Sequence, residues 1–292
     1  MDSFHPVDLD DRKRFQALHD AGQSKASDYS FTNMFGWAEY YGLEWRFTDT
    51  LCWIRETRPE IRYWAPIGDW KGIDWASVPE LSEYGAFIRV PEDLAALWDA
   101  ALPGRVTCTE ARGLWDYLYL AEELATLPGN RFHKKKNLYN QFLKLHPGYS
   151  YTPLDLDCVE SVFQMQAEWC EWHECKDSAA LRAENTAIAR VLKNWDRIPG
   201  LNGGLIRVDG KVVAYTVGER LTDDTLVVHF EKGTTSFKGV YQAINRLFAE
   251  AEKGEYTYFN REQDMDDEGL RKAKDSYNPV EYIKKCTVRV SP

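Results

Sequence analysis

The sequence predicts an α+β protein in which mixed helices and strands form two halves of similar size. The second half alternates helix and strand patterns, and the first half has the same mixed content at about the same length. Hydrophobic residues make up 44% of the chain, enough for well-packed cores. With 292 residues, the chain is long enough for two domains, although no sequence repeat relates the halves.

The first half, residues 1–127, is expected to form a mixed α/β domain. A turn at Asp49-Thr50 predicts a hairpin, and the proline at the start of Pro91–Leu102 favours a helix there. The segment Gly113–Leu120 is apolar and aromatic, so it predicts either a strand pair or the start of a helix. The other expected elements are helices at Arg12–Asp20 and from Phe31, and strands at Trp45–Thr48, Leu51–Glu56, Arg62–Pro66 and Arg105–Glu110.

A basic segment, residues 128–152, separates the halves. The whole chain has a net charge of −10, yet residues 124–154 contain five basic residues and no acidic residue. From Arg131 to Leu145 the apolar residues recur at helical spacing, and Pro-Gly pairs flank the segment. We expect a basic helix that bridges two domains.

The second half, residues 153–292, has the more regular pattern. Two helices precede a hairpin over Asp209-Gly210, which is followed by strand, helix, strand, helix and strand. This order resembles the GNAT fold of the N-acetyltransferase superfamily. The expected helices are Asp157–Glu174, Ala179–Trp195, Val240–Ala251 and Gly269–Tyr277, and the strands are Gly203–Val208, Lys211–Glu219, Val227–Lys232, Tyr256–Phe259 and Ile283–Val290.

Three stretches together resemble one family. They are Tyr29–Trp37, Arg131–Phe142 and Tyr258–Pro279, of which the last is the most specific. They are similar to bacterial proteins related to the C-terminal catalytic domain of lysylphosphatidylglycerol synthase, over nearly the whole chain. The resemblance implies two tandem GNAT-like domains, as in the Fem-type peptidoglycan aminoacyltransferases. It also implies transfer of an amino acid from aminoacyl-tRNA to an amine or a lipid hydroxyl.

Charged residues gather where two central strands of the second half are predicted to end, which is where open α/β sheets place their sites. Acyl transfer needs a group that removes a proton and one that stabilises an oxyanion. We expect Glu231 or Glu262 to act as the base or to orient an amine, and Arg261 and Lys232 to hold an anion. A structural ion-pair network is the alternative. The cluster comprises His229, Glu231, Lys232, Asn260, Arg261, Glu262 and Asp264.

The last predicted helix adds Arg271 and Lys274, which share a face, and Tyr277 on its core face. A solvated helix face is the alternative for the two cations. In GNAT relatives a tyrosine from this region often serves as general acid, so the resemblance makes Tyr277 the candidate by position.

The basic helix presents Lys134, Lys135, Asn137 and Asn140 as candidate anion ligands. Lysine charges suit a phosphate backbone, and the amides add hydrogen-bond donors. A tRNA acceptor stem would fit this surface, as would an anionic lipid headgroup. A solvated linker helix is the alternative.

A CoA thioester is disfavoured as a cofactor, and no metal is expected. GNAT members that use acetyl-CoA carry a Q/R-x-x-G-x-G/A loop after the central strand, whose amides hold the pyrophosphate. The stretch Lys232–Gly239 has glycines and lysines but not that loop, although Gly239 opens a helix that could face an anion. Cys170, His173 and Cys175 lack a fourth ligand in paired spacing.

The chain is expected to be cytoplasmic. Its six cysteines show no framework spacing and are expected to be reduced thiols. Its start is acidic and polar, and no run approaches the roughly 18 apolar residues that span a bilayer.

The favoured function is an acyltransferase that moves an aminoacyl group from tRNA to a small-molecule, peptide or lipid-headgroup acceptor. Two alternatives stay open: a non-catalytic module that binds tRNA, a peptide or an anionic metabolite, and an acetyl-CoA-dependent N-acetyltransferase.

Overall fold

A computed structural model describes residues 3–291. The chain divides into two compact units that alternate along the sequence. The first unit contains the chain up to Tyr117, the loop Gln263–Arg271 and the described residues from Tyr282 onward. The second unit contains Leu118–Glu262 and Lys272–Glu281.

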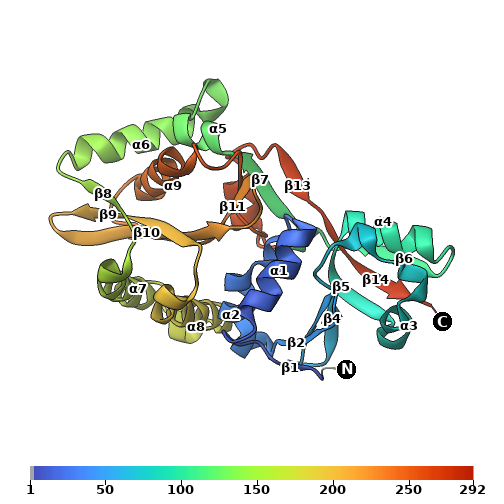
Figure 1. The fold of residues 1–292 in the computed structure, drawn as a ribbon. Helices are drawn as coiled ribbons and strands as arrows, with labels where there is room; N and C mark the ends of the chain where they lie inside the picture. Colours follow the sequence, from blue (N-terminus) through green and yellow to red (C-terminus); the bar gives the residue numbers. More distant parts are fainter. Residues whose placement is uncertain (1–2, 292) are drawn as a thin grey trace. The chain divides into compact units, whose positions relative to one another are not determined.

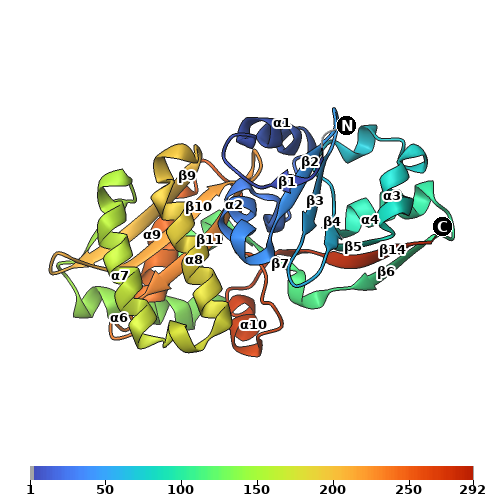
Figure 2. The same cartoon turned by 90° about the horizontal axis from the view of Figure 1, so that it is seen from below.

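The first unit holds a sheet whose described strands follow the order β1-β2-β3-β4-β5-β14-β6 (Figures 1 and 2). Strands β4 and β5 are parallel, and the other neighbouring pairs are antiparallel. Helix α4 packs on β5, β14 and β6. The strands are β1 (His5–Pro6), β2 (Glu44–Phe47), β3 (Cys52–Glu56), β4 (Arg62–Trp64), β5 (Ala86–Pro91), β6 (Val106–Glu110) and β14 (Lys285–Val290), and the helices are α1 (Arg12–Gly22), α2 (Phe31–Tyr41), α3 (Pro79–Tyr84) and α4 (Glu92–Ala101).

The second sheet follows the order β13-β7-β12-β11-β10-β9-β8, in which β11 and β12 are parallel. The strands are β7 (Asp116–Leu120), β8 (Ser150–Pro153), β9 (Leu201–Val208), β10 (Lys211–Arg220), β11 (Thr225–Gly233), β12 (Tyr258–Asn260) and β13 (Glu281–Ile283). The helices are α5 (Ala121–Thr126), α6 (His133–Leu145), α7 (Val159–Trp172), α8 (Ala179–Lys193) and α9 (Val240–Glu252), and a further helix, α10 (Glu268–Asp275), begins in the first unit and ends in the second.

Two helical layers cover the second sheet (Figures 1 and 2). Helix α9 packs on one face, with α5 and α6 against it, and α7 packs on the opposite face beside α8. The apolar residues of α9 recur at helical spacing, so one side of this helix is buried while the other carries polar residues. Ser178 begins α8 by accepting a hydrogen bond from the Leu181 amide, as expected for a helix-capping serine.

The two sheets repeat one arrangement and exchange a strand. Each has a run of antiparallel strands, then a parallel pair (β4–β5 or β11–β12), then a sixth strand antiparallel to the pair. In the first sheet the sixth strand is β14 from the end of the chain, and in the second it is β7 from the first half. The predicted domain boundaries at residues 127 and 153 therefore differ from the boundaries of the compact units. The reason is that the last strand, β14, joins the sheet of the first unit, and β7 joins the sheet of the second.

The basic helix α6 does not bridge two units, contrary to the prediction. It lies inside the second unit and packs against α9. Its Tyr139 and Phe142 are buried in a core with Ile206 of β9 and Ile244 of α9. The apolar residues at helical spacing make α6 part of this core, and they leave Lys134 and Lys136 exposed on the other side.

The prediction of reduced thiols is wrong for one pair of cysteines. Cys170 near the end of α7 forms a disulfide with Cys175, five residues later. The other cysteines are free thiols. The chain turns back on itself between these two residues, so their side chains meet without a framework spacing in the sequence.

The segment Gly113–Leu120 was expected to form either a strand pair or the start of a helix. In the structure a short 3-10 turn at Arg112–Leu114 is followed by the single strand β7. Among residues 3–291, every helix is too short or too polar to cross a membrane.

Candidate functional site

The parallel strands β11 and β12 of the second unit separate at the point where the predicted charged cluster begins. Their pairing ends at Val227 and Asn260, whereas β11 continues to Gly233. Against β10 the register also shifts: Val217 pairs with Phe230 and Gly218 with Val228, so His229 is the extra residue of a β-bulge. Bulges redirect side chains and are common beside active sites. We call His229, Glu231, Arg261, Glu262 and Tyr277 the strand-end cluster.

His229 is held between two carboxylates. Its Nδ1 lies 2.9 Å from Glu262 Oε1, and its Nε2 lies 3.7 Å from Glu219 Oε2, too far for a hydrogen bond. Burial disfavours the charged ring, but the two carboxylates outweigh burial and raise the pKa of His229 to about 9. His229 is therefore an imidazolium at neutral pH and donates its Nδ1 proton to Glu262.

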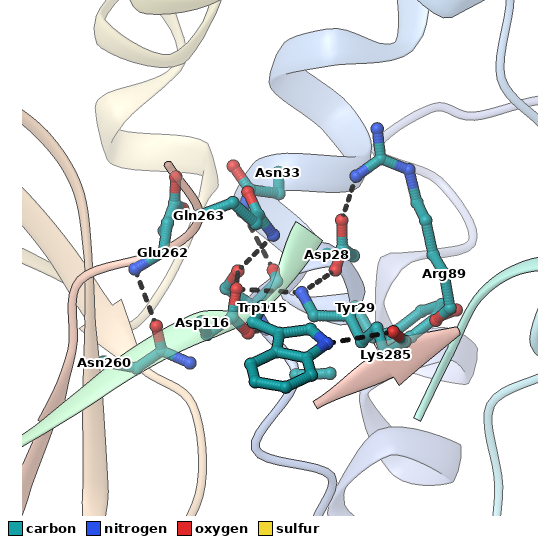
Figure 3. A network of polar contacts seen from close by, with 12 residues as sticks. Asp28, Tyr29, Asn33, Arg89, Trp115, Asp116, Asn260, Glu262, Gln263 and Lys285 are labelled. Carbon is teal, nitrogen blue, oxygen red and sulfur yellow. Dashed lines mark hydrogen bonds and ion pairs between the residues drawn. The ribbon is translucent and has the colours of Figure 1, made fainter. Parts of the chain in front are cut away.

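The Glu262 backbone has an unusual conformation that its neighbours stabilise. Its φ is +56°, a left-handed value that side-chain-bearing residues seldom adopt. Its amide donates to Asn260 Oδ1 at 2.7 Å, and Asn260 is fully buried (Figure 3). Lys274 Nζ donates to the carbonyls of Arg261 and Glu262. Strained backbone that is fixed in this way is typical of functional sites, and here it leaves the Glu262 side chain 19% exposed.

Arg261 and Tyr277 form the other half of the strand-end cluster. Arg261 donates to Glu231 at 2.7 Å, and its guanidinium lies 5.3 Å from the centre of the Tyr277 ring. Tyr277 is buried, and burial together with Glu231 raises its pKa to about 12, even though Arg261 acts in the opposite direction. The phenol therefore keeps its proton at neutral pH. Helix α6 adds Lys135, whose Nζ lies 4.0 Å from the centre of the same ring.

Lys232, predicted to hold an anion, already has an anionic partner. Its ammonium donates to both oxygens of Glu184 on α8, at 2.7 and 2.8 Å, and lies 4.2 Å above the Trp169 ring. Its charge is thus balanced within the protein. Glu184, Trp169 and Glu219 escaped the sequence reasoning because they lie on other elements, and only the tertiary packing brings them to these residues.

Asp264 and Arg271 lie in the first unit and pair with each other. The buried Asp264 carboxylate accepts two hydrogen bonds from Arg271 at 2.8 Å, one from Tyr117 at 2.6 Å and one from Arg112 at 3.0 Å. Burial alone would raise its pKa, but these donors, Arg271 foremost, lower it well below the usual range. Arg271 also pairs with Asp266 at 2.8 Å. The arrangement fastens the loop after Gln263, and neither residue is available to hold a ligand without breaking it.

A buried ionic cluster in the first unit was missed from the sequence (Figure 3). Asp28 pairs with both Arg89 and Lys285, and Lys285 Nζ also lies 2.8 Å from Asp116 Oδ1. Burial would raise the pKa of Asp28, but the two cations hold it below its usual value, while burial raises the pKa of Asp116. The Asp116 carboxylate accepts from the amide and hydroxyl of Ser27 at 2.8 and 2.9 Å. The cluster fixes β14 to the start of β7 and to the turn before α2.

Polar side chains extend this cluster. Gln263 donates to the Ser27 hydroxyl at 3.0 Å, and Asn33 donates to the Ser27 carbonyl at 2.8 Å. The buried Asn33 thus bonds backbone in the turn before α2. No local sequence pattern marks the four charged residues of the cluster, because they lie far apart along the chain. They are Asp28, Arg89, Asp116 and Lys285.

The remaining predicted ligands lie on α6. Lys134, Asn137 and Asn140 are exposed, and Lys135 is half-buried. Within residues 3–291 there is no group of three or more His, Cys, Asp or Glu side chains arranged to hold a metal ion.

Comparisons with known proteins agree with this architecture. Over residues 20–289 the sequence matches the family described as phosphatidylglycerol lysyltransferase, C-terminal. A conserved protein of unknown function from Bacteroides thetaiotaomicron, known from a crystal structure, is 33% identical with a TM-score of 0.92, and the match covers 100% of both chains.

Two more distant structures share the fold. The C-terminal domain of a putative lysylphosphatidylglycerol synthetase from Agrobacterium fabrum has a TM-score of 0.66 at 12% identity, over 96% of this chain and 92% of that chain. FemX has a TM-score of 0.58 at 10% identity, over 98% and 96%. The predicted fold class, two tandem GNAT-like domains of mixed α/β structure, is confirmed.

A curated relative, an uncharacterized protein of Mycoplasmoides gallisepticum, is 22% identical over 176 residues. The match spans 60% of this chain and 56% of that protein. Family and fold together point to an acyltransferase. Since the family match covers residues 20–289 of the 292-residue chain, the chain belongs to the phosphatidylglycerol lysyltransferase C-terminal family.

Proposed function

We propose that the protein transfers an aminoacyl group from aminoacyl-tRNA to an amine or hydroxyl acceptor. The observation that carries the proposal is the Glu262 carboxylate, partly exposed where β11 and β12 separate and held by the buried His229 imidazolium. The family resemblance supplies the reaction class, and the strand-end cluster supplies side chains with suitable chemistry.

Glu262 is the group that accepts a proton from the attacking amine or hydroxyl. As the acceptor attacks the ester carbonyl, a carbon–nitrogen or carbon–oxygen bond forms and the acceptor loses a proton. Glu262 is within reach of solvent, and its partner His229 is a titratable group that holds one carboxylate oxygen in place. Glu231 is the less favoured base because it is bound to Arg261, where its role is to position the guanidinium.

Arg261 and Tyr277 serve the other side of the reaction. A guanidinium has five N–H donors, and Glu231 occupies the Nη2 end of Arg261, so other donors can stabilise a developing oxyanion. When the ester carbon–oxygen bond breaks, the leaving ribose oxygen needs a proton. Tyr277 retains its phenolic proton at neutral pH and is the candidate acid.

The donor's RNA is proposed to lie along the exposed side of α6. Lys134, Lys136, Asn137 and Asn140 are exposed there, and residues 124–154 contain no acidic side chain that would repel a phosphate backbone. The chain is otherwise acidic, so this side of α6 contrasts with the rest of the surface.

Packing at the start of α9 argues against the alternative of a CoA donor. Gly239 begins this helix with φ of +85°, and a Cβ added there would lie 2.1 Å from the Leu138 carbonyl oxygen of α6. The helix start that would bind a pyrophosphate is therefore packed closely against α6. We propose that no CoA thioester is used.

The test is a transfer assay with the purified full chain. Transfer RNAs charged with single amino acids are incubated with a panel of amine, peptide and glycerol-headgroup acceptors, and products are detected by mass spectrometry. Glu262→Gln should lower kcat by about 10²- to 10⁴-fold, the usual contribution of a general base. Glu250→Gln, an exposed carboxylate on α9, is the matched control and should leave kcat unchanged.

Absence of transfer to every acceptor, together with no detectable binding of charged tRNA, would overturn the proposal. Binding of tRNA without transfer would instead favour the non-catalytic module. Transfer from acetyl-CoA would favour the N-acetyltransferase.

A further inference from the structure

Lys135 differs from the lysines on either side of it. Lys134 and Lys136 are exposed, whereas Lys135 is half-buried. Its Nζ lies 4.0 Å from the centre of the Tyr277 ring, within the range of a cation–π contact. The chain folds so that this one lysine turns from the exposed side of α6 toward the strand-end cluster.

The charges around Lys135 are unbalanced. Among the described residues, no carboxylate lies within 4.0 Å of its ammonium, and the charged group that acts on it most is another cation, Arg261. Burial and this repulsion lower the pKa of Lys135 to about 8. Arg261 is itself balanced by Glu231 at 2.7 Å. Two cations therefore adjoin the neutral Tyr277 ring, and Glu231 balances only Arg261, which leaves one positive charge in excess.

We propose that Lys135, together with an Arg261 N–H that neither Glu231 nor the oxyanion occupies, binds one phosphate group of the donor beside the Tyr277 ring. This phosphate site depends on the proposed function in one respect, namely that the donor is an RNA. Ammonium and guanidinium groups are the side chains that bind phosphate most strongly, through charge-assisted hydrogen bonds. A phosphate would remove the excess charge and relieve the repulsion between the two cations. Lys135 is then a binding residue for one defined phosphate, distinct from the general attraction of the α6 surface for RNA.

Occupancy has a direct chemical readout at the Lys135 amine. At pH 8 an amine with a pKa of about 8 is roughly half unprotonated, against roughly 0.4% for a lysine in a model peptide. A bound phosphate favours the ammonium form and covers it. Trace labelling with acetic anhydride at pH 8, read by peptide mass spectrometry, should therefore modify Lys135 readily in the native chain and much less when phosphate is bound.

The experiment uses inorganic phosphate and an RNA hairpin ending in CCA as separate probes, with chloride at equal ionic strength as the control. Either probe should protect Lys135 from labelling, and the lower protecting concentration identifies a free anion or an RNA phosphate as the source. Lys135→Met should weaken hairpin binding by roughly 10-fold, the effect of one charge-assisted contact, and Lys135→Arg should restore it. Lys136→Met, on the exposed side of the same helix, should change it by less than about 3-fold.

The proposal is overturned if neither probe protects Lys135, or if Lys135→Met and Lys136→Met weaken binding equally. Failure here is distinct from failure of the proposed function: transfer without protection removes only the phosphate site. Protection without transfer keeps the phosphate site and removes the transfer reaction.

Discussion

Replacing His229 with glutamine tests whether its imidazolium stabilises the folded chain. In the native structure the ring lies 2.9 Å from Glu262 and 3.7 Å from Glu219, and its side chain is fully buried. Burial opposes the charge, but the two carboxylates raise the pKa of His229 to about 9. Glutamine keeps a polar side chain of similar size and removes the titration.

The sign and size of the effect follow from linkage between protonation and folding. A histidine in the unfolded chain has a pKa of about 6.5, lower than in the folded protein, so protonation favours folding. The stabilisation is complete below about pH 6.5 and is lost as the pH rises through about 9. A difference of about 2.5 pK units corresponds to about 3 kcal/mol at most.

The assay is urea unfolding of the native chain and His229→Gln between pH 6 and pH 10 at constant ionic strength. The difference between their free energies of unfolding should shrink by up to about 3 kcal/mol over this range. Subtracting the two free energies of unfolding cancels the pH dependence of groups that both proteins contain. One such group is Lys135, whose lowered pKa makes stability rise with pH, opposite to the effect of His229. His133→Gln replaces an exposed histidine of α6 and is the control. A difference that stays constant with pH would refute the charged state of His229.

Three other substitutions test the packing that surrounds the site. Gly239→Ala should destabilise the protein by about 2–4 kcal/mol, because the left-handed backbone and the close Leu138 carbonyl both oppose a Cβ. Asp264→Asn should cost about 2–4 kcal/mol, since it leaves Arg271 without its full carboxylate partner. Lys285→Met should cost about 3–5 kcal/mol, because it leaves Asp116 buried beside Asp28 without a shared cation. Each value is measured by chemical denaturation.

Each substitution has a matched control elsewhere in the chain. Gly254→Ala introduces a Cβ where nothing lies within 4 Å, and Asp266→Asn changes a carboxylate that is 75% exposed. Lys284→Met removes the half-exposed neighbour of Lys285. All three should alter stability by less than about 1 kcal/mol. Equal losses in a substitution and its control would show that the assigned contacts do not stabilise the fold.

The position of the strand-end cluster could be predicted because strand ends and alternating charges are local properties of the sequence. His229, Glu231, Arg261 and Glu262 were expected near one another, and the structure brings them together. Their pairing could not be predicted. It depends on the bulge at His229, since a shift of one residue in register changes which side chain faces which partner.

Long-range electrostatic pairs carried no signal in the sequence. Lys232 was expected to hold an anionic ligand, but Glu184 of α8 pairs with it. Asp264 and Arg271 were also expected to hold a ligand, but they pair with each other. The sequence also does not show which of the two sheets a strand will join. The alternating pattern of Ile283–Val290 predicts a strand, and this pattern is the same whichever sheet supplies the neighbours.

The exchange of β7 and β14 has a consequence for synthesis on the ribosome. Strands β5 and β6 are made early, but β14, which pairs with both of them, is made after every strand of the second sheet. Until β14 has been made, these two strands keep unpaired edges of the kind that recruit other chains. In the second sheet the sixth strand, β7, is made before its neighbour β12. The second sheet therefore gains its sixth strand without delay, whereas β5 and β6 of the first sheet wait until β14 has been made.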